Sequence, residues 1–128
     1  TIGQDEKGIT YFGNDIGLLE FDGIEWKIYQ MPNFSLIRSL AVESHSTIYV
    51  GALGELGRWD RNQAGKLQYT SFKNMLPPKS LENESFWRIW IDNDKVYFQS
   101  FSNIYVYDHH TIQQLTTKRF SIADQSEE

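Results

Sequence analysis

The sequence has no cysteine among its 128 residues. This absence excludes disulfides, iron–sulfur clusters and thiol catalysis, but it does not indicate a compartment, because an exported protein need not carry disulfides. No apolar run approaches the roughly 20 residues of a membrane-spanning helix. We therefore expect no membrane insertion of this region. No charged-then-apolar segment opens the chain either, so an export signal would lie upstream or would have been removed.

Positive charge is also scarce. The formal net charge is −5, and the 12 Lys and Arg residues are scattered, with only Lys118 and Arg119 adjacent. A nucleic-acid-binding protein needs a basic stripe that displaces counterions from phosphates. The chain has no such stripe, and we expect no nucleic acid to bind this region.

Aromatic and β-branched residues, in contrast, are plentiful. Hydrophobic residues make up 40% of the chain and aromatic residues 15%, enough for a folded core of single-domain size. Most of them lie in short runs rich in Val, Ile, Tyr and Phe, a composition that favours strands over helices.

An internal repeat organises these runs. Two independent landmarks recur with the same separations, 38 and then 48 residues: Tyr11, Tyr49 and Tyr97 within an apolar run, and Asp22, Asp60 and Asp108 at the end of the next run. The longer second interval contains the polar stretch Lys73–Ser85, with Pro77 and Pro78.

Each copy contains four strand-like runs separated by turn residues. The first run ends on an acidic turn, and the second is the most apolar and is expected to be an inner strand buried on both faces. The third ends on aspartate, and the fourth has the weak pattern of a solvated edge strand. The fourth runs are Ile24–Tyr29, Leu67–Phe72 and Thr111–Leu115.

Four antiparallel strands every 40 residues or so are typical of a β-propeller blade. We predict an all-β fold, a partial β-propeller of three four-stranded antiparallel blades, over about 1–31, 36–72 and 86–116. Residues 117–128 would be a tail or, at Lys118–Ile122, the first strand of a next blade. Because propellers close with about four to eight blades, we expect a fragment of a larger propeller. Its exposed apolar end faces would contact the remaining blades of the parent or self-associate.

The first copy, from Ile2 to Trp26, reads I-G-Q-D-E-K-G-I-T-Y-F-G-N-D-I-G-L-L-E-F-D-G-I-E-W. It resembles the regulator-propeller repeat of large bacterial sensor proteins, the hybrid two-component histidine kinases and the triple-tyrosine-motif transcriptional regulators. Ile37–Gly51 and Trp87–Asp108 resemble the following repeats, so the resemblance covers essentially the whole chain. The third copy departs from the family at Gln99 and Ser100, where Gly-Thr or Gly-Asn is common.

The resemblance implies a periplasmic sensor region of many blades, followed by a triple-tyrosine immunoglobulin-like domain, a membrane span and a cytoplasmic output domain. In the hybrid kinases of this family the usual signals are oligosaccharides released from complex glycans. A histidine kinase output domain would belong to the parent protein and is not present in this sequence.

The residues themselves predict no catalytic site, no metal site and no cofactor. The neighbouring carboxylates Asp5 and Glu6, like Asp92 and Asp94, fall in hairpin turns, where Asp commonly hydrogen-bonds its own backbone. The aspartate at the end of each third run recurs once per copy, which favours a structural turn. His45, His109 and His110 lack ligands at metal-site spacing and are expected to be solvated.

Binding is the more promising role. In a propeller, the turns between second and third strands share one rim with the connections between blades. This places aromatic, amide, carboxylate and arginine side chains together, a combination that suits sugar recognition. The candidate ligand-binding residues are Asn14, Asp15, Phe34, Arg38, Glu55, Glu84, Trp87, Arg88, Phe101 and Asn103, with Ser102 beside them. Alternatively, Phe34 and Phe101 pack between blades and the polar residues solvate loops. Trp26, Trp59 and Trp90 lie within strands and are expected to pack in the core or between blades.

Three functions follow from these features. The first is a non-catalytic, periplasmic sensor propeller of a bacterial signalling or transcriptional regulatory protein, with an oligosaccharide as ligand. The second is a protein–protein interaction scaffold. The third, an enzyme, is disfavoured because no unique polar cluster breaks the repeat.

Overall fold

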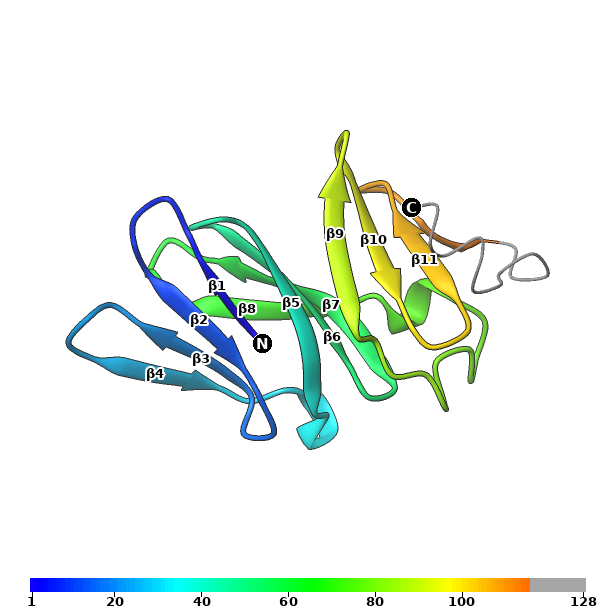
Figure 1. Cartoon of the computed structure of the whole chain (residues 1–128), viewed down its shortest axis with the longest axis horizontal. Helices are drawn as coiled ribbons and strands as arrows, with labels where there is room; N and C mark the ends of the chain where they lie inside the picture. The colour runs from blue at the N-terminus through cyan, green and yellow to red at the C-terminus, as the bar shows by residue number, and fades with distance from the viewer. Residues whose placement is uncertain (116–128) are drawn as a thin grey trace.

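The computed structural model describes residues 1–115, and these form three four-stranded antiparallel sheets arranged in chain order (Figure 1). Blade 1 contains β1 (Ile2–Gln4), β2 (Thr10–Gly13), β3 (Leu18–Phe21) and β4 (Trp26–Tyr29). Blade 2 contains β5 (Ile37–Ser44), β6 (Thr47–Ala52), β7 (Glu55–Arg61) and β8 (Leu67–Ser71). Blade 3 contains β9 (Arg88–Asp92), β10 (Lys95–Gln99), β11 (Ile104–Tyr107) and β12 (Ile112–Gln114). The predicted all-β partial propeller is therefore confirmed.

Two short 3-10 helices join the blades in the described part of the chain. The first, η1 (Pro32–Phe34), connects blade 1 to blade 2, and the second, η2 (Lys73–Met75), begins the longer connection to blade 3. Within residues 1–115 no helix has the length and apolar character that crossing a membrane requires. The expected strand at Lys118–Ile122 lies outside the described residues.

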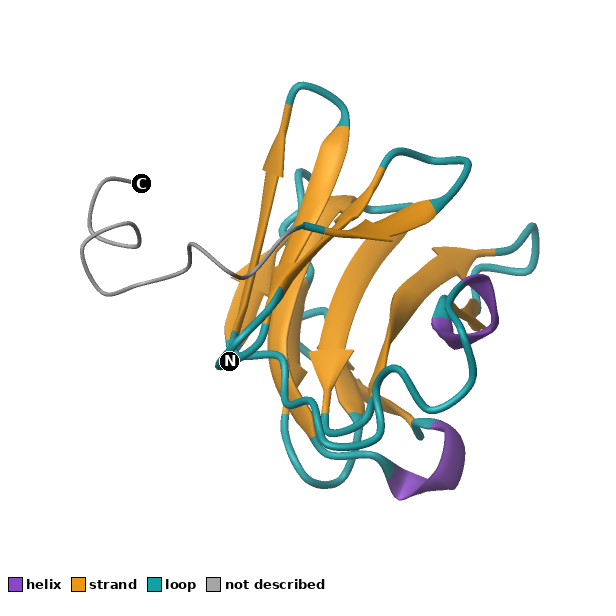
Figure 2. Cartoon of the chain, turned by 90° about the vertical axis from the view of Figure 1, so that its right-hand side faces the viewer, coloured by secondary structure: helices purple, strands orange, loops and turns teal. Residues whose placement is uncertain are grey.

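The sheets stack face to face, with the first strands in contact across the blades: β5 lies beside β1 on one side and β9 on the other. Figure 2 shows the strands running side by side, with the two short helices to one side of them. Two apolar cores result. One, between blades 1 and 2, includes Tyr11, Leu18, Ile48 and Trp59, and the other, between blades 2 and 3, includes Tyr49, Phe72, Phe98 and Tyr107.

Within residues 1–115 only blade 2 has a blade against each face, and burial follows from this. Five of the six residues of β6 are buried, whereas β2 and β10 alternate between buried and more exposed residues. The prediction of a second strand buried on both faces is therefore right for β6 and wrong for β2 and β10.

One face of blade 1 has no other blade of residues 1–115 against it, and we call it the open face of blade 1. Strand register places six apolar residues on it: Ile2, Phe12, Leu19, Phe21, Trp26 and Ile28. Trp26 is 54% exposed, and its ring stacks on Phe21 within the same sheet, with centroids 4.4 Å apart. The prediction of core or inter-blade packing is thus confirmed for Trp59, which is 5% exposed, and wrong for Trp26.

A polar network also joins blades 1 and 2. Arg61 of β7 donates from Nη2 to Glu20 Oε1 at 2.7 Å and to Tyr11 Oη at 2.8 Å. Tyr11 in turn donates to Asp5 Oδ2 at 2.7 Å, and His45 Nδ1 lies 2.9 Å from that same oxygen. The expectation that His45 is solvated is therefore wrong, because its ring is part of the contact between two blades.

Candidate functional site

The predicted rim exists along the lower edge of the molecule as drawn in Figure 1. It combines the β2–β3, β6–β7 and β10–β11 turns with the two connections between blades. Backbone hydrogen bonds hold these segments together: Ile37 N–H donates to the Asn14 carbonyl at 3.3 Å, Leu53 N–H to Leu36 at 3.0 Å, and Gly54 N–H to Glu84 at 2.7 Å. The rim is thus one hydrogen-bonded ridge across all three blades.

The part of the rim between blades 2 and 3 brings four of the predicted residues together. Asn103 Nδ2 donates to Glu84 Oε1 at 2.8 Å, which ties the β10–β11 turn to the connection between the blades. The Arg38 guanidinium lies over the Trp87 ring, 5.4 Å from its centroid. Trp87 N–H donates to the Gln99 carbonyl at 2.9 Å, so its backbone is fixed while its side chain stays 58% exposed.

Two polar atoms in this region lack partners. Arg38 Nε and Glu84 Oε2 are buried and accept or donate no hydrogen bond within residues 1–115. Buried polar groups are nearly always hydrogen-bonded. Arg38 Nε and Glu84 Oε2 are thus an unpaired donor and an unpaired acceptor in this part of the rim.

Phe34 and Phe101 are the most accessible aromatic side chains of the rim, 71% and 89% exposed. The alternative in which they pack between blades is wrong within residues 1–115, because both side chains are mostly exposed. Phe34 has a left-handed backbone, with φ of 54°. Flat apolar rings presented in this way offer stacking surfaces for a ligand.

Other predicted residues serve the fold. Glu55 is 5% exposed and accepts hydrogen bonds from the Tyr69 and Ser71 hydroxyls, so this carboxylate is used within the fold. Its contact with a ligand stays a prediction. Burial raises the pKa of Tyr69, and the adjacent Glu55 carboxylate raises it further. Asn14 uses its side-chain oxygen within its own turn, accepting from the Ile16 and Gly17 N–H groups.

The two remaining predicted residues lie apart from the Arg38–Trp87 pair. Asp15 is exposed at the tip of the β2–β3 turn. Arg88 lies on the face of blade 3 that points away from blade 2, with its guanidinium 4.7 Å from the centroid of the Trp90 ring. The candidate site therefore consists of five residues in the rim between blades 2 and 3: Arg38, Glu84, Trp87, Phe101 and Asn103.

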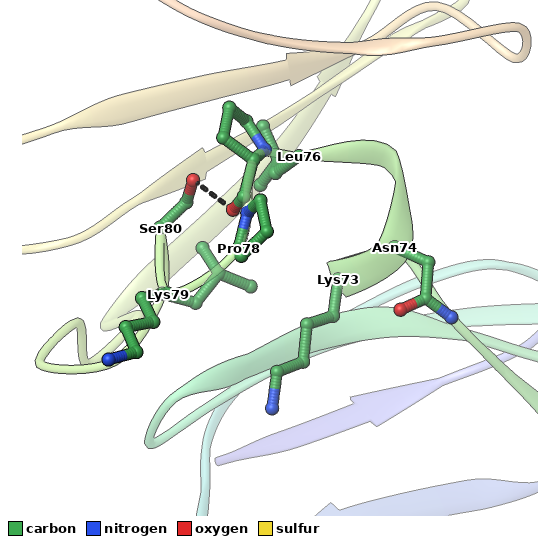
Figure 3. A pocket seen from close by; sticks show the side chains of 8 residues that line it. Lys73, Asn74, Leu76, Pro78, Lys79 and Ser80 are labelled. Carbon is green, nitrogen blue, oxygen red and sulfur yellow. Dashed lines mark hydrogen bonds between the residues drawn. The ribbon is translucent and has the colours of Figure 1, made fainter.

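A pocket that sequence reasoning missed lies in the connection between blades 2 and 3 (Figure 3). Its volume is about 450 Å³, and it is lined by one continuous segment: Lys73, Asn74, Leu76, Pro77, Pro78, Lys79, Ser80 and Leu81. The Ser80 hydroxyl donates to the Pro77 carbonyl and closes the turn, and Lys79 has a φ of 67°. Two ammonium groups at its edge suit an acidic group. The signal in the sequence is Pro77–Pro78, which the repeat spacing identifies only as part of the polar stretch in the longer interval.

The described residues 1–115 contain no cluster of three or more His, Asp or Glu side chains placed to hold a metal ion. The polar clusters they do contain are hydrogen-bonded within the fold, as between Asp5, Tyr11 and Arg61. The exposed rings and polar groups of the rim suit binding through stacking and hydrogen bonds.

No protein-family model and no curated protein matches the sequence. Solved structures do resemble it. Two are of the extracellular domain of BT4673 from B. thetaiotaomicron, described in one case as part of a one-component system and in the other as part of a hybrid two-component system. The TM-scores are 0.66 and 0.67, at 17% sequence identity and over 93% of this chain. The chain spans only 16% and 15% of those two chains. The likeness shows a shared fold.

Proposed function

We propose that this chain is a non-catalytic part of the extracytoplasmic, periplasmic sensor region of a bacterial signalling protein, and that its rim binds an oligosaccharide. The observation that carries the proposal is the likeness, over 93% of the chain, to an extracellular domain of a two-component system. The regulator-propeller pattern of the first repeat points to the same class of protein.

The rim between blades 2 and 3 supports a sugar as the ligand. Trp87 and Phe101 present exposed rings that can stack on the apolar face of a sugar. Beside them, Arg38 Nε and Glu84 Oε2 provide a buried donor and a buried acceptor with no partner in residues 1–115. The hydroxyl groups of an oligosaccharide both donate and accept hydrogen bonds, which suits an unpaired donor and an unpaired acceptor.

The test is calorimetric titration of the 128-residue chain with a panel of neutral and acidic oligosaccharides. We expect saturable binding to at least one member. Trp87→Ala should weaken it at least about tenfold, the equivalent of about 1.4 kcal/mol. The loss follows from removing the stacking surface and the ring that the Arg38 guanidinium covers.

Ile24→Ala is the matched control, because Ile24 is also an exposed apolar side chain but lies in the β3–β4 turn, outside the rim. Its affinity should equal that of the parent chain. Absence of binding across the whole panel would refute the oligosaccharide ligand. Equal losses in the two variants would refute the rim as its site.

A further inference from the structure

The pocket in the connection between blades 2 and 3 is built by one short segment that the core of the molecule holds in place. Leu81 is 1% exposed and belongs to the apolar core between those blades, and the partly buried Leu76 packs against the same core. Pro77 and Pro78 follow Leu76 and line the same pocket. Its volume of about 450 Å³ is that of a small-molecule site.

An unfavourable turn presents Lys79 at the edge of this pocket. The Ser80 N–H donates to the Pro77 carbonyl at 3.1 Å, and Lys79 has a φ of 67°. Proline at the second position, Pro78, and a positive φ at the third are the pattern of a type II turn, which favours glycine or asparagine at the third position. A lysine there has a backbone cost that glycine avoids. Conflicts of this kind between a residue and its backbone are concentrated at functional sites.

A second ammonium group comes from the other end of the segment. Lys73 and Lys79 both line the pocket, and Figure 3 shows their side chains extending to the same side of the chain. Within residues 1–115 neither ammonium forms an ion pair with a carboxylate. The protein as a whole carries a net charge of −5, so two lysines beside one cavity make this a local positive site. Such a site favours an anion.

The rest of the lining distinguishes among anions. Proline has no backbone N–H, so Pro77 and Pro78 offer no donors to the several oxygens of a sulfate or a phosphate. The eight lining residues, all within the described part of the chain, include no arginine, the side chain that binds such groups through two parallel hydrogen bonds. A carboxylate has only two oxygens to satisfy, and the carbon atoms attached to it suit the apolar lining.

From this geometry we propose that the pocket binds a small organic carboxylate. The charged group lies between Lys73 and Lys79, and the carbon body lies against Leu76, Pro78 and Leu81. This site shares no residue with the rim site of the proposed function, so either can fail without the other.

Heteronuclear NMR titration of the 128-residue chain tests the site with four probes: benzoate, glucuronate, benzyl alcohol and inorganic sulfate. We expect saturable shifts centred on residues 73–81 with at least one of the two carboxylates. Benzoate and glucuronate differ in the polarity of the ring, so the tighter of the two shows whether the site takes an apolar acid or a sugar acid.

The other two probes separate the parts of the proposed ligand. Benzyl alcohol retains the ring without the charge, and sulfate is a charge without a carbon body. Each should bind at least about tenfold more weakly than the better carboxylate. No saturable shifts with either carboxylate, or sulfate binding as tightly as the better one, would overturn the proposal.

Lys79→Gly separates binding from folding, because it removes the ammonium group and relieves the turn at the same time. Its melting temperature should rise by about 4 °C, while its affinity for the better carboxylate should fall at least about tenfold. Lys73→Gln removes the other ammonium at an exposed position and should weaken binding to a similar extent with no change in melting temperature.

Lys66→Gln is the matched control, because Lys66 is also an exposed lysine but lies in the β7–β8 turn, outside the pocket. Its affinity should equal that of the parent chain. A Lys79→Gly chain that binds the carboxylate as tightly as the parent would overturn the proposal. Equal losses in Lys66→Gln and the two pocket variants would do the same, because they would show attraction to overall charge and no defined site.

Discussion

Asp5 shows how one carboxylate can serve both a turn and a contact between blades. Oδ1 accepts the N–H groups of Lys7 and Ile9 within the hairpin, at 2.9 and 3.0 Å. Oδ2 receives the Tyr11 hydroxyl and lies against His45 of the next blade. Burial by itself would raise the pKa of Asp5, but the hydrogen bonds from Tyr11, His45, Ile9 and Lys7 outweigh it and hold the pKa below its ordinary value.

This geometry predicts a pH-dependent cost for Asp5→Asn. A carboxyl group with a depressed folded-state pKa stabilises the fold above its unfolded pKa of 3.8, and that contribution is lost as the pH falls through the folded-state value. At pH 7 the variant should lose about 1–3 kcal/mol of unfolding free energy. The difference from the parent should shrink below pH 3.8. Urea denaturation at a series of pH values measures it.

Asp15→Asn is the control for this prediction, since Asp15 is exposed at a turn tip. Its stability should stay within about 0.5 kcal/mol of the parent at each pH, as for most surface substitutions. If Asp5→Asn behaved like the control at pH 7, the network joining blades 1 and 2 would contribute nothing to stability.

For single residues, the sequence predicted which side chains lie in turns better than it predicted what those side chains contact. Asp5 was interpreted correctly as a turn residue, but nothing local showed that His45, 40 positions later, would meet it. Glu55 and Glu84 look alike in the sequence, as carboxylates beside a turn. Tyr69 and Ser71, on the neighbouring strand, donate hydrogen bonds to Glu55, which makes Glu55 a structural residue. They do not reach Glu84, whose Oε2 has no hydrogen-bond partner within residues 1–115.

Hairpins are the elements in which local sequence predicts structure best. Asp22 and Asp108 each follow a third strand and accept two backbone N–H bonds in the turn, as predicted. Asp60 does not: it lies within β7, paired with Arg58 at 2.8 Å. Blade 2 has a longer third strand, and Asn62 takes over the turn, accepting from Ala64 and Lys66. The equal spacing of the aspartates therefore identified the repeat, but it did not predict where β7 ends.

The β9–β10 hairpin offers a test at the scale of a single element. Its two turn residues, Asn93 and Asp94, have φ of 50° and 66°, as a two-residue type I′ turn requires. Glycine adopts this backbone without the cost that a side chain incurs. Asp94→Gly should therefore raise the unfolding free energy by about 1 kcal/mol.

Asp92→Gly provides the comparison, because Asp92 ends β9 and its backbone φ is not positive. The same substitution two residues earlier should lower stability by about 0.5–1 kcal/mol, since glycine weakens a strand. Thermal unfolding of both variants measures the two shifts. Shifts of the same sign would show that this hairpin does not adopt the turn described.

For the whole molecule, the repeat predicted the number of sheets and their antiparallel order, because strand period and turn residues are local properties. It could not predict which faces of the sheets are covered. Tyr11, Tyr49 and Tyr97 occupy equivalent positions in the three repeats. Yet Tyr11 and Tyr49 are fully buried, whereas Tyr97 is half-buried. The difference arises because blades 1 and 2 each have a following blade against them within residues 1–115.

The central claim is that successive sheets pack face to face, which requires glycine at two points. A Cβ at Gly3 would lie 2.8 Å from Val42 Cγ2, and one at Gly13 would lie 2.4 Å from Ile37 Cγ2, so β5 approaches blade 1 through the space these glycines leave. Nuclear Overhauser spectroscopy of the methyl-labelled chain measures this approach directly. The account predicts strong cross-peaks from the Gly3 Hα protons to the Val42 methyls and from the Gly13 Hα protons to the Ile37 methyls. Absence of both, in a chain whose strands are otherwise formed, would contradict it.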